Sequence, residues 1–328
     1  MLSIMSTHST IVEQVSGRDR TMVHRVLVTG SQGFLGAGIV TALGDSSTRV
    51  RRFARRSSAG ATADVVIGDV RDPDAVREAL RDVDVLIHAA SYVGPDPERQ
   101  MSVNVQGTQN VIAAARSTGV RDVIYISTAG VYGRRLGQGM REGEMTERPV
   151  SALSHSRRIA EEAVLGAGGL VLRPHFVAGA GDQWFLGQLL ELQARVGRWI
   201  AKPDARISTI GREQLGAAVA RVVEMNHMPT GVLHAAGAMP VEIGRLLHHV
   251  YSHAGVRPPA GVATDDEIVE LASHLGIEAG KFDLVRSDNW LSSESMWNRL
   301  GWTPQEDEIL STEALDWYAR ILQENPRG

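Results

Sequence analysis

Three glycines near the N-terminal end of the sequence have the spacing of a phosphate-binding turn. Gly30, Gly33 and Gly36 follow a short apolar run, Val26–Thr29, and lead into the apolar stretch Phe34–Leu43. Glycines permit a tight turn and a close approach of backbone to a pyrophosphate, and the free N–H groups of the following helix then face the anion. The pattern predicts a dinucleotide site formed by Gly30, Ser31, Gln32, Gly33, Phe34, Leu35 and Gly36.

The next apolar run ends in arginines instead of an acid. Sites for NAD usually carry Asp or Glu about 20 residues after the glycines, where the carboxylate accepts from the ribose hydroxyls. Here the stretch reads Arg51-Arg-Phe-Ala-Arg55-Arg56. A carboxylate would repel a 2′-phosphate, whereas arginine forms forked, charge-assisted hydrogen bonds to it. We therefore expect NADP(H), with Arg55 and Arg56 at the phosphate; the alternative is a solvated basic strand end.

Beyond the glycines, short β-branched runs alternate with amphipathic stretches. The expected strands are Val26–Thr29, Arg49–Phe53, Val65–Ile67, Val85–His88, Val123–Ser127 and Leu170–Arg173, and the expected helices are Phe34–Leu43, Pro73–Leu80, Val103–Ser117 and Ser156–Leu165. Asp72 and Pro73 supply a start signal for one helix. This alternation predicts βαβ units. The expected fold class is α/β, a Rossmann doubly wound parallel sheet with a smaller C-terminal substrate-binding lobe.

After Arg173 the alternation becomes irregular, because prolines divide the chain into shorter pieces. We expect residues 23–180, with 205–240 returning to them, to form the NADP-binding domain. Residues 181–204 and 241–328 would then form the substrate-binding lobe. The first 22 residues are polar and lack the apolar core of a signal peptide, so a disordered leader is expected, with translation starting at Met1 or Met22.

The composition narrows the classes of partner. A net charge of −4 argues against nucleic acid and against an anionic membrane surface. No apolar run approaches the roughly 18–20 residues of a membrane helix. The chain has no cysteine, which excludes disulfides and thiolate chemistry and fits a cytoplasmic protein. No metal site is expected, because His248, His249 and His253 share a helix face without an evident carboxylate partner.

Several further segments resemble, in order, the motifs of extended short-chain dehydrogenase/reductases. They are Gly68–Val70, His88–Ser91, Asn104–Thr108, Ile126–Thr128, Val131–Gly133, Leu172–Val177, Leu300–Pro304 and Ala314–Tyr318. The resemblance implies that the first segment touches the adenine and that the sixth holds the nicotinamide carboxamide. It adds cofactor contacts at Asp69, Val70, Ala89, Ala90, Ser91, Ser127, Arg157, Pro174 and Val177.

The resemblance fails at the catalytic residues. Members of this family carry a Ser or Thr, a Tyr, and a Lys four residues after the Tyr; the Tyr donates the proton and the Lys lowers its pKa. At these positions the sequence has Thr128, Leu153 and Arg157. Neither of the two lysines, Lys202 and Lys281, lies four residues after a tyrosine. The Tyr-Lys pair is therefore absent.

Three consequences remain open: a non-catalytic NADP-binding regulator, an enzyme with a replacement acid, or an enzyme whose substrate supplies the acid. A general acid contributes about 10²–10⁴-fold, so its loss is survivable. Thr128 is the best-placed hydroxyl but a poor acid by itself. His155 is expected to be a solvated helix-start residue, while His175 could face the nicotinamide and Tyr132 could contact the ligand. Arg157 can hold ribose hydroxyls but cannot donate a proton at neutral pH.

Two long loops, Gly94–Met101 and Arg134–Glu147, are expected to form the mouth of the pocket. Trp184, Phe185 and Met140 offer flat apolar surface for an aromatic ligand, with an ordinary core position for Trp184 as the alternative. The expected substrate contacts are Val93, Thr128, Tyr132, His175, Phe176 and Trp184.

Intact cofactor motifs without the Tyr-Lys pair resemble the atypical ketoreductases of antibiotic biosynthesis that act on angucyclinones. The resemblance implies NADPH-dependent reduction of a ketone on an aromatic polyketide, with the proton supplied by the substrate, in a monomer or homodimer. The alternatives are a nucleotide-sugar epimerase, dehydratase or ketoreductase, and the non-catalytic regulator. Nucleotide-sugar enzymes usually need the Tyr, so Leu153 counts against that alternative.

Overall fold

The structure, a computed structural model, describes residues 24–44, 46, 48–56, 64–275, 279–305 and 309–324. The expected leader of residues 1–22 lies outside these ranges, and so does the choice between Met1 and Met22 as the start. Among the helices of the described ranges, none has both the length and the apolar character needed to cross a membrane.

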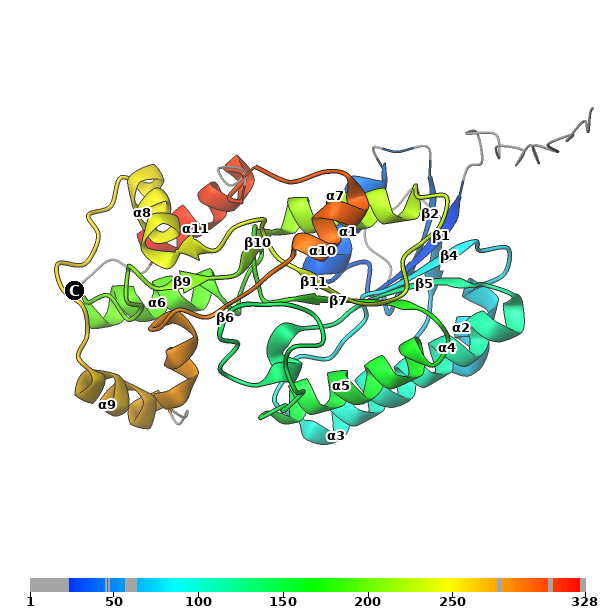
Figure 1. Ribbon diagram of the computed structural model, residues 1–328, viewed down its shortest axis with the longest axis horizontal. Helices are drawn as coiled ribbons and strands as arrows, with labels where there is room; N and C mark the ends of the chain where they lie inside the picture. The colour runs from blue at the N-terminus through cyan, green and yellow to red at the C-terminus, as the bar shows by residue number, and fades with distance from the viewer. Residues whose placement is uncertain are drawn as a thin grey trace, which may run out of the picture.

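The core of the fold is a seven-stranded sheet (Figure 1). Its strands run parallel in the order β11-β7-β5-β4-β1-β2-β3, which is a doubly wound arrangement. They are β1 (Arg25–Thr29), β2 (Arg49–Ala54), β3 (Val65–Ile67), β4 (Val85–His88), β5 (Asp122–Ile126), β7 (Leu170–Pro174) and β11 (Gly231–Ala235). The central strands are buried on both faces, which explains their continuous apolar sequences. The predicted fold class is confirmed.

Helices cover both faces of this sheet (Figure 1). One face carries α1 (Phe34–Gly44), α7 (Arg212–Val223) and α10 (Glu294–Leu300), and the other carries α2 (Pro73–Ala79), α4 (Gly107–Thr118) and α5 (Ala152–Leu165). Helices α1 and α7 approach closely, since a Cβ on Gly216 would lie only 2.7 Å from the carbonyl oxygen of Gly38. At the start of α2, Asp72 accepts hydrogen bonds from the backbone N–H groups of Asp74 and Ala75, which confirms the predicted cap.

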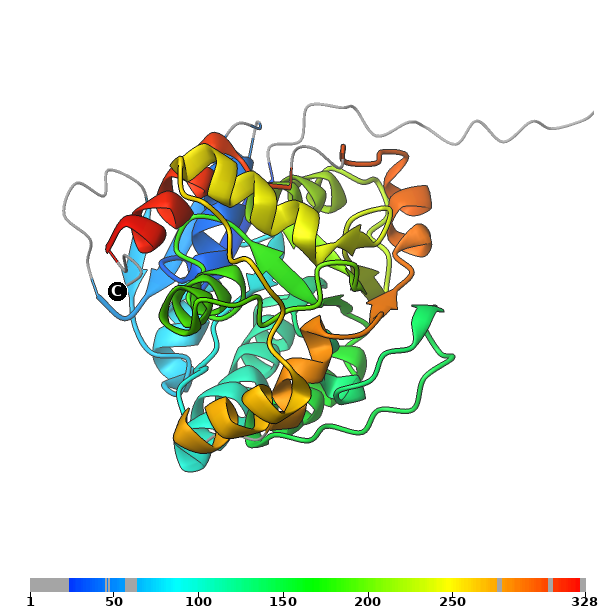
Figure 2. The ribbon, with the colours of Figure 1, turned by 90° about the vertical axis from the view of Figure 1, so that its left-hand side faces the viewer.

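Segments after β7 build a smaller lobe at one end of the molecule (Figures 1 and 2). Its helices are α6 (Leu186–Val196), α8 (Ile243–Ala254), α9 (Asp265–Leu275) and α11 (Thr312–Glu324), with the 3-10 turn η3 (Ala279–Val285). Buried side chains such as Trp199, Tyr251 and Tyr318 form its core. Short strands pair across long stretches of sequence: β8 (Phe176–Ala178) with β10 (Thr209–Gly211), β9 (Arg206–Ile207) with β12 (Val241–Glu242), and β6 (Gln138–Met140) with β13 (Trp290–Leu291).

Two predicted helix boundaries are wrong. The segment Gly94–Met101, expected to be a loop, contains α3 (Pro97–Gln100), which continues through the π-helical η1 (Met101–Gln106) into α4. This helix therefore begins before Val103, because the side chain of Asp96 caps it two turns earlier than expected. The helix expected from Ser156 is α5, and it begins at Ala152 because Ser151 caps it.

Two packing features concern segments that the sequence assigned to the pocket mouth and to the substrate lobe. The segment Arg134–Glu147 contains β6, and its backbone is attached to the chain before β13 by a 2.7 Å hydrogen bond from the N–H of Leu136 to Asn289 Oδ1. Helix α10 belongs to the sheet, because its Met296 and Trp297 are buried among sheet residues. Within the range 241–328 proposed for the substrate lobe, α10 is thus a part that packs on the sheet.

Candidate active site

The glycine turn between β1 and α1 has the geometry of a dinucleotide site. Gly30 has a φ of +66°, and a Cβ there would lie 2.6 Å from the backbone N and Cα atoms of Ala90. A Cβ on Gly36 would lie 2.1 Å from the carbonyl oxygen of Gly30, so both positions require glycine. The first turn of α1 is thereby brought to the carboxyl edge of the sheet, where folds of this kind bind a pyrophosphate. The residues present fit a dinucleotide.

Two side chains of the turn attach it to the end of β2. The buried Ser31 hydroxyl donates to the carbonyl of Phe53 at 3.4 Å, and the exposed Gln32 amide donates to the carbonyl of Arg56 at 2.9 Å. These contacts place the turn beside the strand end that is expected to discriminate between the two cofactors. The other predicted members of the turn are Gly33, which is exposed, and the half-buried Phe34 and Leu35.

The end of β2 is electropositive. Arg55 and Arg56 directly follow the strand and are exposed. The acid expected near the adenine, Asp69, forms an ion pair with Arg71 at 2.8 Å. The hydrogen bond from Arg71 holds the pKa of the Asp69 carboxyl below its usual range, and the charge of Arg55 acts in the same direction. The neighbouring Val70 is buried. The negative charge of Asp69, the only acid predicted at this site, is therefore already paired with Arg71.

The end of β4 is braced by a polar network. Ala89 and Ala90, which are half-buried, follow the strand and face the glycine turn. The Ser91 hydroxyl donates to Asn104 Oδ1 at 3.1 Å, and Asn104 Nδ2 donates to the hydroxyl of Ser156 at 3.0 Å. This network links the strand end, the π-helical turn and α5, so the wall predicted to face the cofactor is rigid.

His88 supports the same strand end from inside the protein. Its ring is fully buried, with Nδ1 2.6 Å from the hydroxyl oxygen of Thr29 and Nε2 2.9 Å from that of Thr108. Burial lowers the pKa of His88 to about 3, and the charge of Arg157 contributes in the same direction. The ring is therefore neutral at physiological pH and serves the structure.

The end of β5 faces the first turns of α5. Thr128 follows the strand, and its hydroxyl oxygen accepts from the N–H of Gly130 at 3.0 Å, which leaves its own proton for another acceptor. Leu153 lies half-buried in the first turn of α5. One turn later Arg157 is buried, and its guanidinium donates to the carbonyl of Ile126. Helix α5 thus presents a fixed cation at this end of the sheet, without a tyrosine or a lysine.

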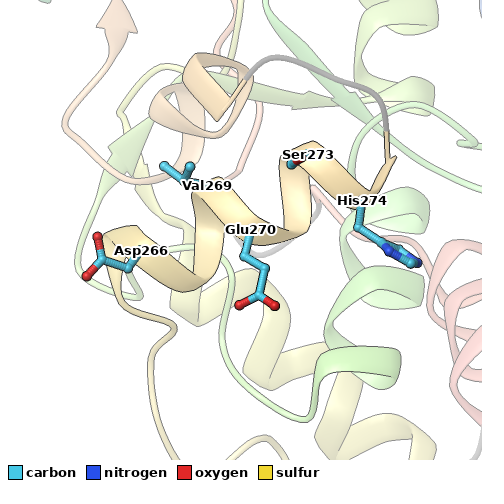
Figure 3. Close-up of a pocket in the computed structure, with 5 residues that line it drawn as sticks. All are labelled: Asp266, Val269, Glu270, Ser273 and His274. Atoms are coloured by element: carbon cyan, nitrogen blue, oxygen red, sulfur yellow. The ribbon is translucent and has the colours of Figure 1, made fainter.

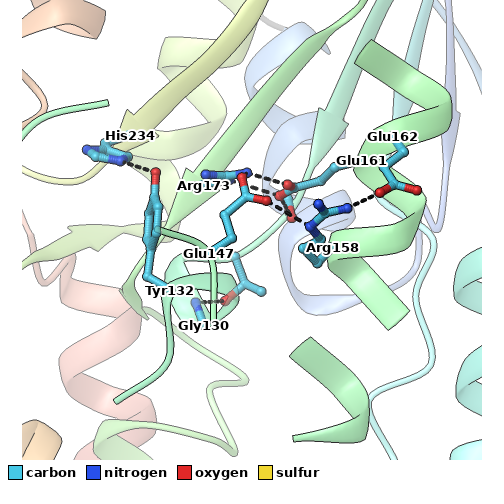
Figure 4. A network of polar contacts seen from close by, with 10 residues as sticks. Gly130, Tyr132, Glu147, Arg158, Glu161, Glu162, Arg173 and His234 are labelled. Atoms are coloured by element: carbon cyan, nitrogen blue, oxygen red, sulfur yellow. Dashed lines mark hydrogen bonds and ion pairs between the residues drawn. The ribbon is translucent and has the colours of Figure 1, made fainter. Parts of the chain in front are cut away.

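A buried ion-pair network lies beneath this region (Figure 4). Glu161 is 2% exposed and Arg173 is 3% exposed, and Arg173 Nε lies 3.0 Å from Glu161 Oε1. The Ser127 hydroxyl also donates to Glu161, so its proton is engaged. Arg173 and Arg158 both contact Glu147, Arg158 at 2.8 Å. Burial opposes the charge on Arg173, but the hydrogen bond and charge of Glu161 prevail and raise its pKa.

Tyr132, which was expected to contact the ligand, is buried and its hydroxyl has a partner within the protein. Its hydroxyl lies 2.8 Å from His234 Nε2 (Figure 4), and its ring is buried beneath the guanidinium of Arg173. His234 Nδ1 lies 3.0 Å from the carbonyl of Ser292, which can only accept, so Nδ1 carries the proton and Nε2 the lone pair. The Tyr132 hydroxyl therefore donates to His234. Burial raises the pKa of Tyr132 as well.

His175 stands in a stack of aromatic rings. Its ring centroid lies 4.0 Å from that of Phe176, which in turn lies 4.1 Å from that of the buried Phe185. Burial lowers the pKa of His175 to about 3, so the ring is neutral and is no general acid at neutral pH. The flanking cofactor candidates Pro174 and Val177 are buried in β7 and β8.

Two of the remaining substrate candidates, Trp184 and Val93, are exposed. Trp184 is 54% exposed, which excludes an ordinary core position, and its ring centroid lies 6.3 Å from that of Phe34 at the start of α1. Val93 is exposed in the segment after β4. Met140 is half-buried against the cluster that contains Tyr132. The structure therefore brings Trp184 to the glycine turn and leaves Tyr132 and Met140 in a separate small core.

Several polar residues that organise the site were not predicted. Glu161, Glu147 and His234 occupy the network around Arg173 and Tyr132. A signal existed for one of them. Glu161 follows Arg157 by four residues, so both face the same side of α5, together with the apolar positions that pack on the sheet.

Other candidate sites lie away from this edge of the sheet. A surface hollow follows the outer side of α9 and is lined by Asp266, Val269, Glu270, Ser273 and His274, in the lobe far from β1 (Figure 3). Over the described ranges, no group of three or more His, Asp or Glu side chains is arranged to hold a metal. Two histidines of α8 have local partners: His248 bonds to the carbonyl of Gly244 and His253 to Asp316. His249 is exposed on α8, and His155 is exposed on α5.

The sequence matches the 3-beta hydroxysteroid dehydrogenase/isomerase family over residues 27–201, which include β1, the glycine turn, β5 and α5. This chain belongs to that family. It is an oxidoreductase, a dehydrogenase or ketoreductase that acts on hydroxyl or keto groups. The predicted likeness to extended short-chain dehydrogenase/reductases is confirmed at this level.

Three relatives illustrate the range of chemistry. The 4-hydroxy-2-methyl-3-oxo-4-farnesyl-3,4-dihydroquinoline-1-oxide ketoreductase of Stigmatella aurantiaca is 28% identical over 77% of this chain and 79% of that protein. The 3 beta-hydroxysteroid dehydrogenase/Delta 5→4-isomerase of Mycobacterium tuberculosis is 32% identical over 57% of this chain and 56% of that protein. The 2-alkyl-3-oxoalkanoate reductase of Stenotrophomonas maltophilia is 34% identical over 53% and 57%. The chain spans little more than half the length of the last two.

Solved structures share the fold. A short-chain dehydrogenase/reductase superfamily protein of Agrobacterium tumefaciens with bound NAD superposes with a TM-score of 0.70 at 20% identity, over 92% of this chain and 98% of that chain. The enzyme WbmG of Bordetella bronchiseptica, in complex with NAD, gives 0.72 at 19% identity over 93% and 96%. Because both identities are so low, these two similarities concern the fold alone.

Proposed function

We propose that this oxidoreductase is an NADPH-dependent ketoreductase that reduces a ketone on an aromatic polyketide of the angucyclinone type, with the proton supplied by the substrate. The carrying observation is an intact dinucleotide turn combined with an end of β5 at which three nearby polar side chains already have partners within the protein. Ser127 donates to Glu161, Tyr132 donates to His234, and Arg157 donates to the carbonyl of Ile126. This combination resembles that of the C7 ketoreductase of simocyclinone biosynthesis.

The chain's own residues would hold the cofactor. The N–H groups at the start of α1 would bind the pyrophosphate, and Arg55 and Arg56 would bind a 2′-phosphate. Arg157 places a positive charge near the expected nicotinamide ribose. When bound, NADPH supplies a hydride to a carbonyl carbon. The residues after β7, Pro174 and Val177, would line the nicotinamide end.

Thr128 is the hydroxyl that would polarise the ketone. Because its oxygen accepts from the N–H of Gly130, its proton can point to a carbonyl oxygen. A threonine hydroxyl is too weak an acid to give that proton away. The carbonyl oxygen would instead take the proton of a neighbouring phenol of the substrate, and solvent would reprotonate the phenolate. Positioning alone can supply ~7–11 kcal/mol of the barrier reduction, more than the contribution of a general acid.

Two of the three relatives support a polycyclic ketone as the substrate, whereas the third is named for a 2-alkyl-3-oxoalkanoate. The Stigmatella protein is named for a keto group on a dihydroquinoline ring system, and the Mycobacterium protein for a steroid. Both of these compounds have a rigid fused-ring skeleton, which differs from the nucleotide sugars of the alternative hypothesis. We assign the substrate lobe to residues 181–204 and to those after 241, without α10. A monomer or homodimer in the cytoplasm remains our expectation.

The test compares NADPH oxidation with three ketones. A hydroxyquinone polyketide with a phenol next to the ketone should be reduced, whereas the same compound with that phenol methylated should be reduced at least about tenfold more slowly. A nucleotide ketosugar should not be reduced. Equal rates for the parent and methylated compounds would refute substrate assistance, and reduction of the ketosugar alone would support the alternative. No oxidation of NADPH with any ketone, despite tight binding, would favour a regulator.

A further inference from the structure

Trp184 is a large aromatic side chain held in an exposed position beside the glycine turn. Its indole is 54% exposed, and its ring centroid lies 6.3 Å from that of Phe34, with 47° between the ring planes. Phe34 begins α1, the helix whose N-terminal end faces the expected pyrophosphate. An exposed aromatic ring at this place would lose solvent contact if a dinucleotide lay along the turn.

The segment that carries Trp184 is fixed by a buried carboxylate. Asp182 accepts hydrogen bonds from the backbone N–H groups of Trp184 at 2.9 Å, Phe185 at 2.8 Å and Leu186 at 2.8 Å. Burial raises the pKa of Asp182, while these N–H donors oppose the rise. The carboxylate therefore holds the start of α6 in one conformation, because its hydrogen bonds must offset its burial.

Tyr318 connects this carboxylate to the last helix of the fold. The buried Tyr318 hydroxyl donates to Asp182 Oδ2 at 2.9 Å and accepts from the N–H of Gly179 at 2.9 Å. One hydroxyl thus joins both ends of the segment 179–182 to α11. Neither Asp182 nor Tyr318 is exposed to a ligand, so any effect they have on the site must pass through the segment that they hold.

Arg212 attaches the same segment to α1 from the other side. Its Nη1 donates to the carbonyl of Ala180 at 2.8 Å, and its guanidinium carbon lies 5.9 Å from the centroid of the Phe34 ring. The segment from Gly179 to Trp184 is therefore held between α11, α7 and the first residue of α1. This arrangement fixes Trp184 relative to the glycine turn.

We propose that Trp184 is a wall of the dinucleotide site and that Asp182 and Tyr318 are positioning residues that hold it there. The inference rests on the proposed function for the identity of the ligand. It moves Trp184 from the polyketide, where the sequence placed it, to the cofactor. The indole would pack against the bound dinucleotide beside Phe34, so that the C-terminal helix contributes to cofactor affinity through a single hydroxyl.

The first experiment observes Trp184 directly. The full chain is labelled with 5-fluorotryptophan, and the resonance of Trp184 among the six tryptophans is assigned with the Trp184→Phe variant. NADP⁺ alone is then added, while calorimetry measures its Kd on the same sample. The proposal expects the Trp184 resonance to shift with NADP⁺, in proportion to the fraction bound, before any ketone is present.

The second experiment tests the positioning residues. Tyr318→Phe removes two hydrogen bonds, so it should displace the Trp184 resonance in the unliganded protein and raise the Kd for NADP⁺ about three- to tenfold. Tyr251→Phe is the matched control, because Tyr251 is a buried tyrosine in the core of the same lobe. It should leave both readouts unchanged. Trp184→Ala changes an exposed position and should raise the Kd for NADP⁺ by a similar factor. This variant tests the proposal if Tyr318→Phe does not fold.

The outcomes separate the two proposals. If the unmodified protein binds NADP⁺ and the Trp184 resonance does not shift, the proposed contact between Trp184 and the dinucleotide is wrong. The proposed ketoreductase function is unaffected by that result. A Trp184→Ala variant with unchanged Kd would overturn the wall in the same way. If Tyr318→Phe and Tyr251→Phe shift the resonance equally, the positioning role is wrong. Failure of the unmodified protein to bind NADP⁺ would overturn the proposed function and this inference with it.

Discussion

Arg157 donates a hydrogen bond to the carbonyl of Ile126, the last residue of β5, and its guanidinium lies over the ring of Tyr125 at 5.3 Å from the centroid. Both partners are backbone or core groups, so the arginine is built into the packing between α5 and the sheet. A lysine has one compact ammonium group and no planar fork, and it would not reproduce these contacts. Replacing Arg157 by lysine is therefore not a conservative change in this protein.

Restoring the family pair should not restore family catalysis. We expect Leu153→Tyr with Arg157→Lys to accelerate ketone reduction by less than about tenfold, well below the range of a working general acid. The measurement is kcat with the preferred ketone, beside His155→Gln as a control on the exposed side of the same helix. An acceleration of about 10²-fold or more would show that the site retains geometry for the missing acid.

Neither remaining candidate acid should be indispensable. Thr128→Ala removes a hydrogen bond to the ketone, and His175→Ala removes a neutral ring that has no proton to give at pH 7. Each should lower kcat by less than about 10²-fold, at the foot of the range for a general acid. Steady-state rates with saturating NADPH check this. A loss of about 10⁴-fold in either variant would identify that residue as the acid.

Tyr132→Phe should affect stability more than turnover. The hydroxyl donates to His234 inside a small core, so its removal leaves a buried acceptor unpaired and should cost about 1–3 kcal/mol of unfolding free energy. Chemical denaturation measures the stability and initial rates measure kcat, which should stay within about threefold. Should kcat fall by about 10²-fold with stability intact, Tyr132 would have a catalytic role after all.

The cofactor preference should depend on the end of β2. Replacing Arg55 and Arg56 by alanine removes two charges that would pair with a 2′-phosphate, so the Kd for NADPH should rise by about 10–10²-fold while that for NADH stays nearly constant. Calorimetry with both cofactors gives the two constants. Arg77→Ala, an exposed arginine of α2, is the control. Equal Kd values for NADPH and NADH in the unmodified protein would contradict the assignment.

Acidification should unfold the protein partly through His88. Its pKa is lowered from 6.5 to about 3 by burial, so the unfolded chain binds more protons than the folded chain between these values. Stability is therefore present above pH 6.5 and falls as the pH drops toward 3, by about 1.4 kcal/mol per pH unit for this group. His88→Gln keeps hydrogen-bonding capacity without a titrating ring. Its unfolding free energy should show a shallower pH slope than the unmodified protein, and identical slopes would contradict this source.

Local patterns in the sequence predicted the framework of the fold. The glycine turn, the buried strands and the Asp72 cap depend on residues within a few positions of one another, and the structure confirms them. The start of α3 could have been found in the same way, because Asp96 precedes Pro97 as Asp72 precedes Pro73. The cofactor and substrate contacts remain predictions.

The contacts that decide which hydroxyls are available could not be predicted. Tyr132 and His234 are 102 residues apart, and Tyr318 and Asp182 are 136 residues apart. No periodicity encodes such pairs, since they depend on how β11 and α11 return to the sheet and to the lobe. The sequence left Trp184 open between an apolar surface and an ordinary core position, and only the structure shows that it is exposed and lies beside Phe34.

The strand order has a consequence for how the chain reaches this shape. Strand β7 ends at residue 174 and pairs with β5 on one side, but its other neighbour, β11, begins only at residue 231. During synthesis, the apolar edge of β7 therefore stays unpaired while the intervening segment is made, and an unpaired apolar edge invites association with other chains. We expect nascent chains that stop between these strands to aggregate, and chains that extend past residue 235 to become markedly more soluble.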